Sequence, residues 1–232
     1  MIRALAAAAK NINTVMGNKY MNLLDSVRNE VRLKMSGVNS CHEWEHTERV
    51  YNLAMHIGQK EGADLETLGL AVILHDIARK EQDESKGKID HAERGAVIAQ
   101  EILKKYNLPA EKLKNILHCI RAHRYRNDIK PSTIEAKVLY DSDKLDSIGA
   151  IGTGRNFAFA GHLGAKVHDK NVNFDETAEY TTDDTAYREY LVKLRYIKDK
   201  IITDEGRKIA AGRHNFQEEF FARLNKEVEG EI

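Results

Sequence analysis

Histidines are concentrated in one part of the chain. Seven of the ten fall between residues 42 and 123: His42, His46, His56, His75, His91, His118 and His123. A lone histidine on a helix is usually a packed or exposed side chain, whereas several imidazoles gathered with carboxylates suit a divalent transition metal. The sequence therefore suggests a metal site, and the carboxylates that accompany the histidines decide how far that hypothesis can be taken.

The dipeptide His75-Asp76 ends the apolar run LGLAVIL, which spans residues 68–74 and is typical of a buried helix. Burying an imidazole and a carboxylate without partners would be costly, so the pair needs hydrogen-bonding neighbours or a ligand. At a helix end both side chains can reach one cavity, and they suit a cation such as Mn²⁺, Fe²⁺, Zn²⁺ or Mg²⁺. From the dipeptide alone, hydrogen bonds to neighbouring helix ends explain the pair equally well.

Two further segments carry side chains of the same kinds. In HEWEH, His42 and His46 stand four residues apart and so share one helical face. In DSDKLD, a carboxylate-rich segment that follows an apolar pair, three aspartates occur at Asp141, Asp143 and Asp146. These carboxylates could complete a metal site, but helix capping and solvation would explain them as well.

The elements that must position these residues are predicted to be helices. The chain has two prolines, and 31% of its residues are charged and 42% hydrophobic, which together favour long amphipathic helices and an all-α fold. Apolar spacing predicts helices near residues 12–34, 42–61, 65–79, 90–106, 109–124, 132–146, 148–161, 185–202 and 204–228. The polar run 166–184 is predicted to be a long loop, either an active-site lid or a plain exposed connection.

Composition excludes several classes of function. The 36 basic and 36 acidic residues of this 232-residue chain balance, so no extended nucleic-acid surface is expected. No stretch approaches the roughly 18 apolar residues of a membrane span, so no membrane role is expected. The two cysteines, Cys41 and Cys119, form no CxxC motif and suggest packed thiols in a reducing, cytoplasmic setting.

Two other motifs receive a structural interpretation. GAIGTGR at residues 149–155 lacks the GK[ST] ending of a phosphate-binding P-loop, so its glycines are assigned to close helix packing. RAHRYR at residues 121–126 could hold a nucleotide between its arginines and Tyr125, but a solvated helix end is the simpler explanation.

The motifs occur in an order that resembles the motif order of a known family. His46 in HTERV, His75-Asp76 in ILHDIAR and Asp143 in DSDKLD are similar to the H…HD…D signature of the HD-domain superfamily of metal-dependent phosphohydrolases. HAERGA at residues 91–96, CIRAH at 119–123, DSDKLDSIGAIG at 141–152 and the C-terminal tail resemble a branch of small, stand-alone bacterial and archaeal HD hydrolases. The resemblance extends over about residues 41–227.

The resemblance implies an all-α HD-domain bundle of about eight or nine helices. Residues 1–40 would form an N-terminal helical leader, residues 41–165 the HD domain, and residues 166–232 a loop and C-terminal helices that pack on the same domain.

The resemblance also implies the ligands of a divalent cation. The residues that match the family's metal ligands are His46, His75, Asp76 and Asp143. Asp143 is preferred because it directly precedes the pair Lys144-Leu145, and Asp141 is held in reserve. His91 and His123 occupy positions similar to those of the histidines that bind a second metal in family members with two metals. The cation would be Mn, Mg, Co, Fe, Ni or Zn, with one or two ions bound.

The reaction implied is hydrolysis of a phosphate ester or anhydride of a small molecule, in particular a nucleotide, by metal-activated water. Asp76 or Asp143 would accept the proton from that water, and Lys144 is the leading candidate to neutralise the phosphate. Further candidates for phosphate contacts are His42, Arg49, Arg79, Arg124 and Arg155. For the arginines, a solvated charge on a helix face is the competing explanation.

Two other functions remain open on sequence grounds. Some HD-fold proteins bind two irons and use oxygen, and His91 with His123 would be needed for that chemistry. A binding module that senses a nucleotide without hydrolysing it is the other, although the full ligand set argues against a degenerate sensor. The sequence also leaves a homodimer open.

Overall fold

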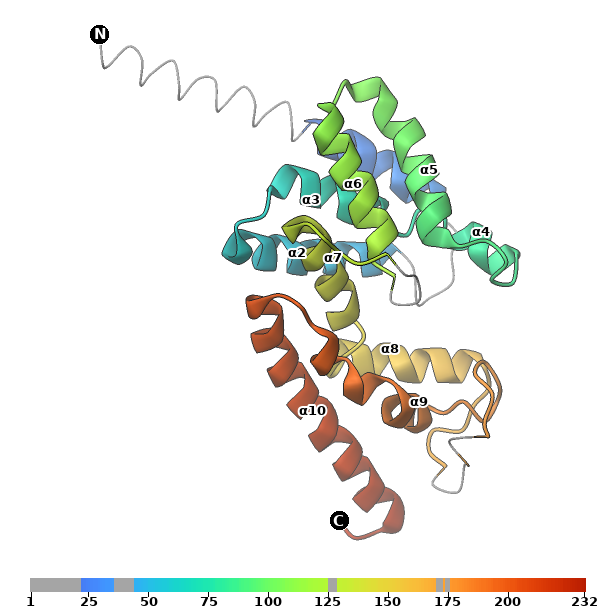
Figure 1. Ribbon diagram of the computed structural model, residues 1–232. Coiled ribbons are helices and arrows are strands. Elements are labelled where there is room, and N and C mark those ends of the chain that lie inside the picture. The colour runs from blue at the N-terminus through green and yellow to red at the C-terminus, as the bar shows by residue number, and fades with distance from the viewer. Residues whose placement is uncertain (1–21, 36–43, 125–128, 170–172, 174–175) are drawn as a thin grey trace.

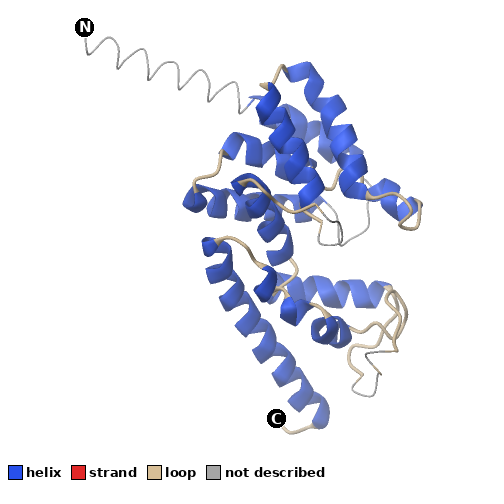
Figure 2. Cartoon of the chain, in the orientation of Figure 1, coloured by secondary structure: helices blue, strands red, loops and turns tan. Residues whose placement is uncertain are grey.

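The computed structural model describes residues 22–35, 44–124, 129–169, 173 and 176–232. None of these residues lies in a β-strand, as Figure 2 shows, so the prediction of an all-α fold is confirmed. No helix among them is long and apolar enough to cross a membrane. The described part of the chain from Trp44 onward contains nine α-helices, which agrees with the expected number.

These helices are α2 (Trp44–Glu61), α3 (Leu65–Leu74), α4 (Arg79–Glu84), α5 (His91–Leu103), α6 (Ala110–Ala122), α7 (Ile134–Leu145), α8 (Gly149–His162), α9 (Ala186–Val192) and α10 (Asp204–Glu229). Three short 3₁₀ turns accompany them, η1 (Lys104–Tyr106), η2 (Leu194–Tyr196) and η3 (Lys198–Lys200). Residues 22–34 are helical as well.

The helices form two groups, which lie one above the other in Figure 1. Helices α2, α3, α5, α6 and α7 pack on one another in the upper group, and α8, α9 and α10 form the lower group. Helix α7 descends toward the lower group, and α10 contacts α7 and α2 as well as α8. The junction between the groups therefore lies at the end of α7, where the aspartate-rich segment falls.

Helix α3 is the centre of the upper group, and all its residues from Thr67 to Leu74 are buried. Its start is fixed by Asp64, whose carboxylate accepts hydrogen bonds from the backbone N–H groups of Glu66 at 3.0 Å and Thr67 at 3.4 Å. Helices α2, α6 and α7 pack around it. The continuous apolar run of the sequence thus reflects a helix that is enclosed on every side.

Helix boundaries differ from the predicted ones in two places. The helix expected over residues 65–79 ends at Leu74; residues 75–78 form turns, and the unpredicted helix α4 begins at Arg79. The helix expected over residues 185–202 is wrong, because α9 ends at Val192 and is followed by η2 and η3. The buried residues Tyr190, Leu194, Ile197 and Ile201 keep a spacing of three or four, which 3₁₀ turns satisfy as well as an α-helix.

The proposed leader, residues 1–40, is only partly within the described residues. Over residues 22–35, the side chains of Leu24, Val27, Val31 and Met35 are buried in the same hydrophobic core as α2 and α3. This stretch therefore packs on the domain. The division at residues 40 and 165 stays a prediction.

Part of the polar run 166–184 also lies outside the described residues. Its end is anchored by Arg188 of α9, which is 5% exposed and donates to Asp184 at 2.8 Å and to the carbonyl of Thr177 at 2.6 Å. These two contacts of the buried Arg188 guanidinium hold the segment that precedes α9 against the helix.

Candidate metal centre

Six side chains from the upper group of helices meet in its interior. Helix α2 contributes one from its first turn, α5 one from its first residue and α7 one from its last turn, while the others follow the ends of α3 and α6. They are His46, His75, Asp76, His91, His123 and Asp143. The first five are at most 2% exposed, and the Asp143 side chain is 20% exposed. Asp143 is therefore the member that reaches toward solvent.

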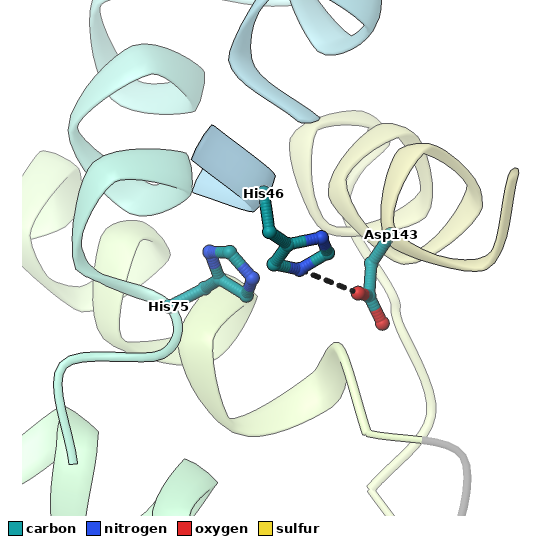
Figure 3. A group of neighbouring side chains, drawn as sticks. All are labelled: His46, His75 and Asp143. Carbon is teal, nitrogen blue, oxygen red and sulfur yellow. Dashed lines mark ion pairs between the residues drawn. The ribbon is translucent and has the colours of Figure 1, made fainter. Parts of the chain in front are cut away.

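The first ligand group consists of His46, His75 and Asp143, whose ligand atoms all lie within 4.8 Å of one another. Figure 3 shows the two imidazoles and the carboxylate converging from three elements. His46 Nε2 is 3.4 Å from Asp143 Oδ1. Asp76 closes the other side, with its Oδ2 3.8 Å from His46 Nε2 and 3.6 Å from His75 Nε2.

The second ligand group consists of Asp76, His91 and His123. Asp76 Oδ1 is 3.3 Å from His91 Nε2 and 3.6 Å from His123 Nε2. The two oxygens of one carboxylate thus face two neighbouring sets of imidazoles. If each set held a cation, Asp76 would be a ligand available to both.

Every imidazole of the centre makes a hydrogen bond through Nδ1. The acceptors are Asp146 Oδ2 for His46 at 2.8 Å, the Val72 carbonyl for His75 at 2.6 Å, Gln82 Oε1 for His91 at 2.7 Å and the Ile120 carbonyl for His123 at 2.6 Å. With its proton on Nδ1, a neutral imidazole carries a lone pair on Nε2. All four lone pairs therefore face the centre, in the orientation that metal ligands need.

These residues fit a divalent cation. His91 Nε2 and His123 Nε2 are 3.2 Å apart, and two nitrogen lone pairs at that distance repel each other unless a positive charge lies beside them. His75 Nε2 is buried and makes no hydrogen bond with any described residue. Donor atoms that share a cation at about 2.1 Å lie about 3.0–3.4 Å apart, and the separations here are 3.2–3.8 Å.

Burial and neighbouring charges set the protonation of the centre. Burial lowers the pKa of His75 to about 4 and that of His91 to about 2, despite the nearby charge of Asp76. Burial also acts to lower the pKa of His46, but hydrogen bonds with Asp143 and Asp146 outweigh it and the pKa is raised. A proton and a cation therefore compete for the same nitrogen of His46.

The catalytic candidate Lys144 lies beside Asp143. Its Nζ donates to Asp143 Oδ2 at 2.8 Å and to the His123 carbonyl at 3.2 Å, and it lies 5.1 Å from the centre of the Tyr140 ring. Burial acts to raise the pKa of Asp143, but the charge of Lys144 and the contact with His46 hold it well below its ordinary value. Asp143 is therefore ionised at neutral pH.

Four of the five phosphate candidates lie within the described residues, and each contacts a carboxylate. Arg79 lies 3.5 Å from Asp76 Oδ1. Arg124 pairs with Asp90, the N-cap of α5. Arg49 and Arg155 both donate to one carboxylate, that of Asp146. The remaining candidate, His42, and Tyr125 lie outside the described residues.

The three aspartates that follow the apolar pair have different surroundings. Asp143 faces His46. Asp141 accepts hydrogen bonds from the backbone N–H groups of Ile202 at 2.9 Å and Thr203 at 2.7 Å, so it fixes the start of α10. Asp146 accepts from His46, a contact that sequence reasoning did not assign. The sequence feature that could have indicated this contact is spacing, because Asp146 follows the proposed ligand Asp143 by three residues.

Most other histidines have ordinary partners. His56 lies 3.3 Å from Glu205, His118 accepts from the N–H of Ser132, and His168 hydrogen-bonds Asn225. The Cys119 thiol is buried, and burial raises its pKa to about 12. It is therefore a packing residue rather than a nucleophile.

The sequence is similar to a known protein family and to a known bacterial protein. The sequence model of the HD domain family matches residues 44–148. The uncharacterized protein YpgQ of Bacillus subtilis is 31% identical over 217 residues, which cover 91% of this chain and 97% of YpgQ.

Solved structures are similar over nearly the whole chain. The crystal structure of Bacillus subtilis YpgQ in complex with ADP has a TM-score of 0.71 and 28% identity, and the match covers 90% of this chain and 96% of YpgQ. The structure of an HD-superfamily hydrolase from Bacillus thuringiensis has a TM-score of 0.72 and 25% identity, with 90% and 98% covered.

Proposed function

This chain belongs to the HD-domain superfamily and is related to HD-superfamily hydrolases, and from that premise we propose that it is a metal-dependent phosphohydrolase. Its substrate is a small phosphate ester or anhydride, in particular a nucleotide. The proposed ligands of the principal cation are His46, His75, Asp76 and Asp143. His91 and His123, together with Asp76, are proposed to bind a second cation.

The observation that carries this proposal is the position of Asp76 between the two ligand groups. Its oxygens lie 3.3–3.8 Å from four imidazole nitrogens, and those imidazoles direct their lone pairs inward. This arrangement of nitrogen and carboxylate donors suits several divalent metals, namely Mn, Fe, Co, Ni, Zn and Mg. The assay of the proposed activity is therefore run with each metal in turn.

A divalent cation held there would lower the pKa of a water molecule and withdraw charge from a phosphoryl oxygen. Asp143 is ionised and partly exposed, whereas the Asp76 side chain is 1% exposed. We therefore assign Asp143 as the acceptor of the water proton and Asp76 as a ligand only. Lys144, whose side chain is 13% exposed, is assigned to the charge of the phosphoryl group.

The nucleotide assignment draws on the complex of YpgQ with ADP. A diphosphate needs cations near the ligand groups, and Arg79, with a side chain 16% exposed and 3.5 Å from Asp76, is an arginine candidate beside a proposed ligand. Arg124, 23% exposed, could leave Asp90 for a phosphate. Arg49 and Arg155 are better explained by their contacts with Asp146. His42 stays a prediction.

A panel of nucleotides and sugar phosphates, each tested with Mn²⁺, Co²⁺, Mg²⁺, Ni²⁺, Zn²⁺ and anaerobic Fe²⁺, tests the proposal. We expect phosphate release from at least one nucleotide that requires metal and disappears in Asp76→Ala. Tight nucleotide binding without turnover would favour the sensor instead.

The second ligand group gives the di-iron alternative a specific basis, since His91 and His123 could hold a second iron. Two irons per chain after anaerobic purification, with substrate-dependent oxygen uptake and no phosphate release, would favour that function. We keep hydrolysis as the proposal because Lys144 and Arg79 supply positive charge beside the ligands, which a phosphate needs.

Cytoplasmic location completes the proposal, and a homodimer stays a prediction. A free buried thiol at Cys119 is compatible with a reducing compartment, and sedimentation of the purified chain measures its assembly.

A further inference from the structure

Asp146 is a buried carboxylate that the proposed reaction does not use. It directly follows α7 and is 2% exposed. It accepts hydrogen bonds from three side chains on two other helices, His46 and Arg49 of α2 and Arg155 of α8. Through these hydrogen bonds, the Asp146 carboxylate connects the metal-centre residue His46 and helix α2 of the upper group to helix α8 of the lower group.

The imidazole of His46 lies between two carboxylates from the same end of α7. Asp146 Oδ2 is 2.8 Å from Nδ1, and Asp143 Oδ1 is 3.4 Å from Nε2. A carboxylate paired with arginines can only accept, so the hydrogen bond at Nδ1 requires the proton to be there. Nε2 then has its lone pair available toward the ligand group.

The two arginines fix the carboxylate in this role. Arg49 donates from Nε to Oδ1 at 2.9 Å and from a terminal nitrogen to Oδ2 at 3.1 Å. Arg155 donates to Oδ2 at 2.7 Å and to the backbone carbonyl of Asp146 at 3.1 Å. Because a guanidinium has donors only, no partner of Asp146 competes with it as an acceptor of the His46 proton.

We propose that Asp146 is a positioning residue for the metal centre, which holds the proton of His46 on Nδ1 and so presents Nε2 as a ligand, while Arg49 and Arg155 hold the Asp146 carboxylate in place. This rests on the proposed function, in which His46 is a metal ligand. It gives the two arginines a role in orienting a ligand instead of binding phosphate. Partners of this kind orient ligand imidazoles, and their loss typically weakens metal affinity about 10–100-fold.

Two substitutions separate hydrogen bonding from charge. Asp146→Ala removes the acceptor, so we expect metal affinity to fall about 10–100-fold. Asp146→Asn keeps an oxygen that can occupy the Oδ2 position and accept from Nδ1, so it should recover most of that loss. The matched control is Asp184→Ala, because Asp184 is also buried and pairs with Arg188 but not with a histidine. Its metal affinity should equal that of the wild type.

The proton position is measured directly by the ¹⁵N shifts of His46 in metal-free protein, at a pH high enough that the shifts no longer change and this imidazole of raised pKa is neutral. Wild type and Asp146→Asn should carry the proton on Nδ1, and Asp146→Ala should move it toward Nε2. The wild-type measurement is independent of whether the alanine variant folds.

A wild-type proton on Nε2 would overturn the positioning role. The same holds if Asp146→Ala binds metal as tightly as wild type while His46→Ala does not. If His46→Ala binds metal like the wild type, the proposed metal centre fails instead, and the ¹⁵N result still reports the contact between Asp146 and His46.

Discussion

Replacing Asp76 by Asn should remove most of the stabilisation that metal gives to the fold. Asn has nearly the same volume, so the metal-free variant should stay folded. Asp76 belongs to the second ligand group and lies beside the first, with oxygens 3.3–3.8 Å from four imidazole nitrogens. Its negative charge therefore acts on the imidazoles of both ligand groups.

The size of the effect follows from electrostatics and linkage. With an effective dielectric constant of about 20, a carboxylate about 2 Å from a dication would gain about 17 kcal/mol before desolvation. One sixth of that, about 2.8 kcal/mol, already corresponds to about a 100-fold change in Kd. We therefore expect metal binding by Asp76→Asn to be weaker by at least about 100-fold.

Thermal unfolding with and without Mn²⁺, after removal of bound metal by a chelator, measures this. Metal at 100 times its wild-type Kd stabilises by about 2.7 kcal/mol, which raises the Tm of a chain of this size by about 5–11 °C. At the same concentration the Tm of the variant should rise by less than about 2 °C. Asp184→Asn, the control, should keep the wild-type shift. An Asp76→Asn protein that keeps the full shift would refute the reasoning.

Three further outcomes are expected. His91→Ala should lower the metal content from two ions per chain to one by elemental analysis; unchanged content would remove the second ligand group from the account. Asp64→Ala removes the cap of α3 and should cost about 1 kcal/mol by urea unfolding. Burial acts to raise the pKa of Asp64, but contacts with Lys112 and Thr67 outweigh it and lower that pKa. The stabilisation that Asp64 gives the fold is therefore present above the ordinary Asp pKa and is lost as pH falls through the lowered value. A difference in stability between Asp64→Ala and wild type that stays constant into acid would contradict this. Gly152→Ala should destabilise the fold by about 1–3 kcal/mol, because the added Cβ would overlap the backbone carbonyl group of Ser147; a variant as stable as wild type would show that the turn before α8 yields easily.

The fold class and the convergence of His46, His75, Asp76 and Asp143 were accessible from the sequence for different reasons. Apolar spacing reports the burial of helix faces, which settles the fold class. The convergence rests on the resemblance to a family, because spacing along the chain does not say which helix ends meet. The broken segment after α9 shows the limit of spacing, since 3₁₀ turns bury Leu194 and Ile197 as an α-helix would.

The partners of the charged residues were not accessible in the same way. Arg49 and Arg155 are 106 residues apart, and both were considered for phosphate, yet both contact Asp146. Sequence reports that a side chain is charged but not which opposite charge faces it across the fold. The contact between Asp146 and His46 depends on the turn at the end of α7, which only the three-dimensional arrangement reveals.

The central claim is that these side chains bind divalent metal, and a crystal structure of protein loaded with Mn²⁺, with anomalous scattering measured at the manganese edge, tests it most directly. We predict an anomalous peak among His46, His75, Asp76 and Asp143, with His46 coordinated through Nε2 and its Nδ1 still bonded to Asp146. A second peak beside His91 and His123 would mark the second ion. A Mn²⁺-saturated crystal with no anomalous peak at these residues would contradict the account.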